Sequence, residues 1–166
     1  MVFVTIGNAT QIFPRLLNAV DELAGAGGFG NEEVIVQSGH TTHFRHQYCI
    51  ARPFINMDEF DRLMEEANLI ICHGGCTQLQ AVRLGKVPVV MPRRKKYGEH
   101  VNDHQVQLVE VLVDEGMVVP AFEPNDLARA VAEAQLRNTN KGVPPASPMV
   151  SLVAQAIKEL LAAKTH

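Results

Sequence analysis

A glycine pair beside a histidine is the first group of residues in this sequence that could do chemistry. Gly74 and Gly75 follow the short apolar run 69–72 and precede a helical stretch from about Thr77 to Leu84. Glycines let the backbone come close to a ligand, and the N-terminus of the helix behind them offers free N–H groups and a partial positive charge. The pattern indicates a phosphate site, although a tight strand-to-helix turn without a ligand has the same pattern.

A second group of polar residues follows the next apolar run, 88–91. Its members are cations, carboxylates, amides and imidazoles: Arg93, Arg94, Lys95, Lys96, Glu99, His100, Asn102, Asp103, His104 and Gln105. In an open α/β sheet, ligands bind beyond the carboxyl ends of the strands, so we expect both groups at one crevice. A nucleotide-sugar, with a diphosphate at one end and sugar hydroxyls at the other, fits these side chains.

Three stretches resemble the glycosyltransferase family 28 C-terminal domain, the donor-binding half of GT-B enzymes. They are HGG at 73–75, RLGKVPVVMPR at 83–93 and KKYGEHVNDHQ at 95–105, and the resemblance extends from residue 2 to about 135. It implies an α/β fold: a Rossmann-like parallel sheet with helices on both faces. The sequence is most similar to the soluble subunits of split enzymes, such as the dolichol-linked GlcNAc transferase and its bacterial exopolysaccharide counterpart.

The resemblance also implies which residues bind the donor. They are Gly7, Asn8, Gln37, Gly39, His73, Gly74, Gly75, Cys76, Thr77, Gln80, Arg93, Asn102, Asp103, His104 and Gln105. Gln80 stands where relatives often carry an acidic residue that binds the ribose, so here an amide replaces a charge. Asp103 to Gln105 would bond the sugar, and Phe54 with Ile55 would lie near the uracil. The alternatives are that Asp103 only caps a helix and that Phe54 belongs to the core.

The catalytic groups are less clearly marked. The candidates for acid–base work are Glu99, His100 and His104. The run from Arg93 to Lys96 fits a diphosphate, an anionic lipid or lipid-linked pyrophosphate, or simply a solvated charged loop.

We expect no metal and no cofactor besides the UDP-sugar donor. A DxD motif and the full GxGxxG fingerprint of a dinucleotide site are both missing. Two groups of possible ligands match no four-ligand zinc spacing: His40, His43 and His46, and Cys72, His73 and Cys76.

Composition excludes several classes of protein. The 166 residues are 46% hydrophobic and 20% charged, as expected of one globular domain. A net charge of -3 argues against nucleic-acid binding. Cys49, Cys72 and Cys76 form no even disulfide framework, which favours a reducing compartment. No apolar run approaches the ~20 residues of a membrane-spanning helix.

Strands and helices alternate along the chain. Expected strands are 2–6, 33–37, 49–55 with an interruption at Pro53, 69–72, 88–91 and 117–119; expected helices are 13–26, 59–67, 77–84, 103–114 and 126–136. Asp58 and Asn125 are the expected N-caps of two of these helices. Alternation of this kind predicts a parallel sheet. We expect one domain over 1–136, a linker over 137–148, and an amphipathic helix of the same domain over 149–166.

These features predict the catalytic, donor-binding subunit of a split UDP-sugar-dependent glycosyltransferase. It would transfer a hexose or N-acetylhexosamine to a lipid-linked saccharide acceptor in polysaccharide biosynthesis. A membrane-anchored, acceptor-binding subunit is the expected partner, and it would hold this cytoplasmic chain at the inner membrane. The main alternative is a non-catalytic nucleotide-sugar-binding or enhancer subunit, and a weaker one is an epimerase-like fragment.

Overall fold

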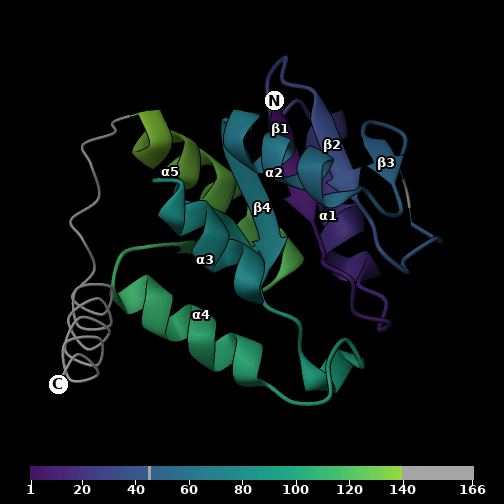
Figure 1. Ribbon diagram of the computed structural model, residues 1–166, viewed down its shortest axis with the longest axis vertical. Coiled ribbons are helices and arrows are strands. Elements are labelled where there is room, and N and C mark those ends of the chain that lie inside the picture. The colour runs from purple at the N-terminus through teal and green to yellow at the C-terminus, as the bar shows by residue number, and fades with distance from the viewer. Residues whose placement is uncertain (45, 140–166) are drawn as a thin grey trace, which may run out of the picture.

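The computed structural model describes residues 1–44 and 46–139, which form one six-stranded sheet (Figure 1). Its order is β3-β2-β1-β4-β5-β6, and every neighbouring pair is parallel. The strands are β1 (Val2–Thr5), β2 (Val34–Gln37), β3 (Ile50–Arg52), β4 (Leu69–His73), β5 (Val89–Met91) and β6 (Val119–Pro120). The predicted all-parallel α/β sheet is confirmed.

Helices cover both faces of the sheet, because alternate strand residues point to opposite faces and both sets are apolar. Val2 and Val4 share one core with α1 (Pro14–Gly25) and α5 (Leu127–Thr139). Phe3 shares the other core with α2 (Met57–Glu66), α3 (Cys76–Arg83) and α4 (His104–Asp114). Two 3-10 turns complete the described elements, η1 (Lys95–Tyr97) and η2 (Pro124–Asp126).

The strand order reverses direction between β1 and β4. The chain passes from β1 to β2 and β3 toward one edge of the sheet, and from β4 to β5 and β6 toward the other. Thr5 pairs with Gln37 on one side and with Cys72 on the other, so the carboxyl ends of these three strands are level. In doubly wound sheets this switch point opens a crevice for ligands.

Several predicted boundaries are wrong for local reasons. Helix α2 begins two residues before the predicted Glu59, and its N-cap is Asn56 instead of Asp58, because the Asn56 side chain accepts a hydrogen bond from Glu59 N at 2.8 Å. Strand β3 ends at Arg52, at the predicted interruption by Pro53, since proline has no N–H to donate to a ladder, and it does not resume at 54–55.

The last described helix differs from its prediction at both ends. Asn125 lies inside η2, where Glu123 and Asp126 form a capping box, so the predicted Asn125 cap is wrong. Helix α5 continues past 136 to Thr139. The rest of the predicted linker and the C-terminal helix lie outside the described residues. Within the described part of the chain, no helix has the length and apolar content to cross a bilayer.

Candidate functional site

The loops that follow β1 and β4 meet around the imidazole of His73. Gly7 has φ +70°, and a Cβ there would lie 2.7 Å from His73 Cε1. A Cβ on Gly75 would collide with the same ring from the α3 side. Only glycine therefore fits at both places, and this explains the glycine on each side of the switch point.

His73 is uncharged at neutral pH. Burial, and then the nearby positive charge of Arg93, lower the pKa of His73 from 6.5 to about 4. The ring therefore supplies no positive charge to an anion in the crevice. It acts through its shape and as a neutral hydrogen-bonding group.

The N-terminus of α3 opens into the crevice. Gly75 is its N-cap and provides no side-chain cap, so the N–H groups of Cys76 and Thr77 are left for a ligand or water, whereas Gln78 N donates to the Gly75 carbonyl at 3.4 Å. Gly74 brings this turn close to α4, because a Cβ there would lie 3.0 Å from Gln105 Cβ and 3.1 Å from Val109 Cγ2. The glycine turn therefore leads directly into a helix N-terminus beside α4, and its binding of an anion stays a prediction.

A cavity of about 230 Å³ lies beside this turn. Its lining residues are Gly7, Asn8, Gln37, Ile55, Met57, Phe60, Cys76, Thr77 and Gln80. Six of them belong to the predicted donor-binding set and come from the loop after β1, from β2 and from α3. Ile55, Met57 and Phe60 form an apolar side, opposite polar groups such as Asn8 and Thr77. A cavity smaller than the ~300–1,000 Å³ of a full ligand site suits part of a ligand.

Two other predicted residues shape the loop after β1. Gln37 accepts a hydrogen bond from the Thr5 hydroxyl at 2.6 Å and donates to the carbonyls of Gly7 and Pro53 at 3.3 and 3.2 Å. Gly39 has φ +52°, and a Cβ there would lie 2.7 Å from the carbonyl oxygen of Gly7. Gln37 thus both lines the cavity and ties three loops together, whereas Gly39 supports the Gly7 loop from behind.

Phe54 is neither in the core nor in the cavity lining. It is 53% exposed, and its ring meets that of His40 edge-on with centroids 5.1 Å apart. The alternative of a core residue is therefore wrong. Ile55, its neighbour, does line the cavity.

The loop between β5 and α4 is held by its own polar side chains. Asp103 Oδ1 accepts a hydrogen bond from Lys95 N at 2.9 Å, and Gln105 Oε1 accepts one from Arg93 N at 3.0 Å. Asn102 Oδ1 accepts one from His104 N at 3.2 Å. Asp103 makes no side-chain cap to α4, so simple capping does not explain it. The second Asp103 oxygen and the Gln105 NH₂ make no hydrogen bond to the described residues.

Arg93 lies beneath the crevice rather than at its surface. Its side chain is fully buried and donates to the carbonyls of Ile6 at 2.8 Å, Gln11 at 2.8 Å and Glu99 at 3.2 Å. Burial lowers its pKa to about 10, so it is still charged at neutral pH. The predicted direct contact between Arg93 and the donor does not fit this position. Its hydrogen bonds join the β1–α1 loop to the β5–α4 loop.

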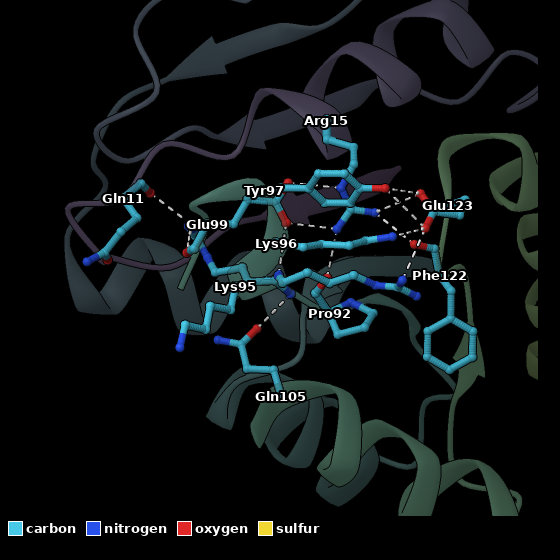
Figure 2. Close-up of polar contacts among 12 residues, drawn as sticks. Gln11, Arg15, Pro92, Lys95, Lys96, Tyr97, Glu99, Gln105, Phe122 and Glu123 are labelled. Atoms are coloured by element: carbon cyan, nitrogen blue, oxygen red, sulfur yellow. Dashed lines mark hydrogen bonds and ion pairs between the residues drawn. The ribbon is translucent and has the colours of Figure 1, made fainter. Parts of the chain in front are cut away.

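The Glu99 carboxylate is bound by the side chain of Arg15 (Figure 2). Its two carboxylate oxygens accept hydrogen bonds from Arg15 Nε and Nη2, both at 2.9 Å, and Oε2 also accepts one from Arg94 N at 3.0 Å. Arg15 further donates to the carbonyls of Pro92 at 2.9 Å and Phe122 at 2.8 Å. We call Arg15, Arg93 and Glu99 the arginine brace. A buried carboxylate bound this way is poorly placed for the predicted acid–base role.

The two histidines of the loop remain accessible. His100 is half-buried, with Nδ1 3.0 Å from Asn102 Oδ1, and the exposed His104 has Nδ1 3.1 Å from Gln107 Oε1. Their acid–base role stays a prediction.

The four cations of the 93–96 run have separate roles. Arg94 and Lys96 pair with Glu123, at 3.2 and 3.5 Å, as Figure 2 shows for Lys96, while Lys95 is exposed. A side-chain hydrogen bond with Tyr97 is the main cause of the raised pKa of Lys96. The run is thus mostly part of the fold of this loop.

Four residues of the site region were not predicted from the sequence. Met57 and Phe60 line the cavity, Asp61 contacts Gln80, and Arg15 belongs to the arginine brace. Met57 and Phe60 lie on one helical face, which is a usable signal once α2 is known to flank the switch point. Arg15 has no such signal, because its partner Glu99 is 84 residues away.

No group of three His, Cys, Asp or Glu side chains in residues 1–44 and 46–139 could hold a metal ion. A larger hollow of about 510 Å³ lies at the amino ends of the strands, lined by Glu32, Glu65, Glu66 and Lys86 among others. The Lys86 ammonium there donates to the carbonyls of Met64 and Ala67 at the end of α2, so it caps a helix.

Comparison with solved structures shows the same fold in larger enzymes. The glycotransferase of kitacinnamycin has a TM-score of 0.59 and 20% identity, and the calicheamicin glycosyltransferase CalG4 has a TM-score of 0.60 and 17% identity. SnogD from Streptomyces nogalater has 0.52 and 18%. The matches cover 98%, 97% and 93% of this chain, but only 39%, 41% and 43% of those chains. The chain therefore spans about two fifths of their length.

Sequence comparison gives the family. A search of curated protein sequences finds no significant match. The family model "Glycosyltransferase family 28 C-terminal domain" matches residues 1–160, nearly the whole chain. Together with the switch-point crevice and the GT-B neighbours, this match shows that the chain belongs to the glycosyltransferase family 28 C-terminal domain family.

Proposed function

We propose that this domain binds a UDP-sugar and, with an acceptor-binding partner, transfers its sugar. The observation that carries the proposal is the arrangement of the crevice. The uncapped N-terminus of α3 and the Gly7 loop lie together at the switch point, with the polar residues 102–105 following the next strand. Backbone N–H groups at a helix N-terminus suit a diphosphate, and carboxylate and amide groups suit sugar hydroxyls.

Each part of the donor can be assigned to a set of residues in this crevice. The diphosphate would lie against Gly74, Gly75 and the first turn of α3. The nucleoside would extend into the cavity between Phe60 and Gln80. The sugar would then reach Asp103, His104 and Gln105, whose unused polar atoms can pair with hydroxyls.

The reaction would be a hexosyl or N-acetylhexosaminyl transfer. The bond between the anomeric carbon and the phosphate oxygen breaks, a bond to the acceptor oxygen forms, and the acceptor's proton passes to a base. The departing UDP gains negative charge, which the N–H groups of α3 would stabilise. His100 and His104 are the candidates on this chain for handling the proton, since Glu99 is bound in the arginine brace.

The acceptor would be bound elsewhere. Because the chain spans 39% to 43% of the length of its solved relatives, an acceptor-binding half has to come from outside these 166 residues. We assign it to a membrane-anchored partner subunit that presents a lipid-linked saccharide in polysaccharide biosynthesis, with this chain on the cytoplasmic side. No cofactor or metal is required in this scheme.

Calorimetry tests donor binding directly. The purified chain is titrated with UDP, UDP-GlcNAc, UDP-glucose and UDP-galactose, and we expect UDP to bind and one UDP-sugar to bind more tightly. Gln105→Ala removes the amide that would bond the sugar, so it should weaken binding of the UDP-sugar more than binding of UDP. No heat with any ligand at millimolar concentration would contradict the proposal, and equal losses for UDP and UDP-sugar would contradict the placement of the sugar.

The alternative function is a non-catalytic donor-binding or enhancer subunit. The engagement of Glu99 by Arg15 favours it, because one of the three catalytic candidates is then structural. Co-expression with the partner followed by transfer assays of His100→Ala and His104→Ala separates the two functions. Loss of transfer with donor binding and assembly intact places catalysis on this chain, whereas full activity of both variants supports the alternative.

A further inference from the structure

A hydrogen bond between an amide and a carboxylate joins two helices that flank the cavity. Gln80 Nε2 donates a hydrogen bond to Asp61 Oδ1 at 2.9 Å. Gln80 lies on α3 and lines the cavity, whereas Asp61 lies on α2. The two helices flank the same cavity, because α2 also contributes Met57 and Phe60 to its lining.

This contact fixes the orientation of the Gln80 amide. A carboxylate only accepts hydrogen bonds, so the NH₂ of Gln80 must face Asp61 and its carbonyl oxygen must face away. The other carboxylate oxygen of Asp61 accepts no hydrogen bond from the described residues. Both residues are half-buried: Gln80 lines the cavity, and Asp61 borders it next to the Gln80 amide without being one of the lining residues. The pair therefore presents several acceptor atoms, one of them charged, at the edge of the cavity.

Paired acceptors are what a vicinal diol requires. A ribose has two neighbouring hydroxyl donors, and hydrogen bonds to a charged acceptor are shorter and stronger than those to a neutral one. An amide alone offers only one acceptor oxygen. A carboxylate beside the amide supplies the missing charge without a change at position 80.

From this geometry we infer that Asp61 supplies the charged acceptor for the ribose hydroxyls of the nucleotide, with Gln80 as the bridge that positions it. This inference rests on the proposed function, since it requires a nucleoside diphosphate in the crevice. It makes Asp61 a specificity-determining residue on α2 for ribonucleotides over 2′-deoxyribonucleotides.

Calorimetry with UDP and 2′-deoxy-UDP tests the inference. We expect the wild-type chain to bind UDP more tightly than 2′-deoxy-UDP. Asp61→Asn should weaken UDP binding by roughly tenfold or more. The ratio of the two affinities should then move toward one. Asp58→Asn is the matched control, because it makes the same change on the exposed first turn of α2 and should leave the ratio unchanged.

A charge exchange gives a second, independent readout. Gln80→Glu alone places two carboxylates side by side and should weaken UDP binding by repulsion. Asp61→Asn combined with Gln80→Glu restores one carboxylate and one amide, and should recover much of the lost affinity ratio. Thermal melting of each variant confirms that it folds.

The outcomes distinguish failure of the proposed function from failure of the role assigned to Asp61. If the wild-type chain binds no UDP, the proposed function fails. If it prefers UDP over 2′-deoxy-UDP and Asp61→Asn keeps the same ratio, the role of Asp61 is overturned while donor binding stands. If the Asp61→Asn/Gln80→Glu variant recovered none of the lost preference for UDP over 2′-deoxy-UDP, the role of Asp61 would also be overturned. The charge of this pair would then not determine the preference for ribose.

Discussion

At the scale of single residues, His73 links the geometry of the crevice to acid stability. Its ring fills the space between two glycines, and this close packing is possible only because the ring is buried and neutral. Protonation in the folded state would place a positive charge near Arg93. The site is thus built around a histidine that resists protonation.

The pKa of His73 predicts a pH dependence of stability. Its folded-state pKa of about 4 lies below the ordinary 6.5, so between these values the unfolded chain binds more protons than the folded chain. The stabilisation is complete above pH 6.5 and is lost as the pH falls toward 4. From this group alone we expect a loss of about 2 kcal/mol in the free energy of unfolding between pH 7.5 and 5.

Urea unfolding at several pH values measures this effect. His73→Asn removes the titrating group, and its free energy of unfolding should fall less steeply over the same range than that of the wild type. Carboxylates that titrate at lower pH contribute to both curves, so only the difference between the curves is read. Parallel curves would show that His73 does not titrate as its burial implies.

At the scale of elements, the arginine brace connects the loops that form the crevice. Arg15 extends from α1 to Glu99 and Pro92 in the β5–α4 loop and to Phe122 after β6 (Figure 2). Side-chain exposures of 12% for Arg15 and 4% for Glu99 leave little water to screen the pair. The brace therefore fixes the loop that carries residues 102–105.

A double-mutant cycle tests this coupling. Arg15→Ala or Glu99→Ala leaves a buried charge without its main partner, and each should lower the free energy of unfolding by about 3–5 kcal/mol. The double variant should cost clearly less than the sum, with a coupling energy of about 2 kcal/mol. Urea unfolding at one pH gives all four values. Additive losses would mean that the two side chains act independently, and the brace would then not exist as a unit.

The contrast between the glycine turn and the brace shows which parts of the site the sequence could predict. The turn at Gly74 and Gly75 is local, since its strand, glycines and helix follow one another, so its position and its uncapped helix could be predicted. The brace joins Arg15 to Glu99 across 84 residues, and no periodic pattern marks such a pair. A polar residue in that loop could equally face the ligand, so Arg93 and Glu99 were predicted to act at the crevice surface.

Burial of polar groups was hard to predict for the same reason. Gln78 lies on α3 with no exposed surface, and its amide makes no hydrogen bond within the described residues. A sequence pattern would place an amide in the first turn of this helix at the surface or on a ligand. The alternation of strands and helices, by contrast, predicted the parallel sheet. Strands that are buried on both faces must be apolar at nearly every position, so they are easy to recognise in the sequence.

At the scale of the whole molecule, apolar side chains are exposed along the carboxyl edge of the sheet. Ile12, Phe54, Met57 and Val101 are 56%, 53%, 72% and 69% exposed, and they follow β1, β3 and β5. We call these four residues the apolar rim. All four therefore lie at the edge of the sheet where the crevice opens, and Met57 also lines the cavity. Exposed apolar groups mark interaction surfaces, which fits the proposed partner subunit.

Charge on the apolar rim should separate partner binding from donor binding. Val101→Glu and Ile12→Glu put a carboxylate where the partner would pack, so each should abolish co-purification with a co-expressed membrane-anchored half-size glycosyltransferase, and with it sugar transfer. UDP affinity should change less than twofold, because neither side chain lines the cavity. Leu136→Glu is the matched control: Leu136 is 63% exposed on α5, away from the carboxyl edge, and its variant should still assemble. If Leu136→Glu blocked assembly while both rim variants assembled normally, the partner would dock on the α5 face instead, and the crevice would have to receive its acceptor by another route.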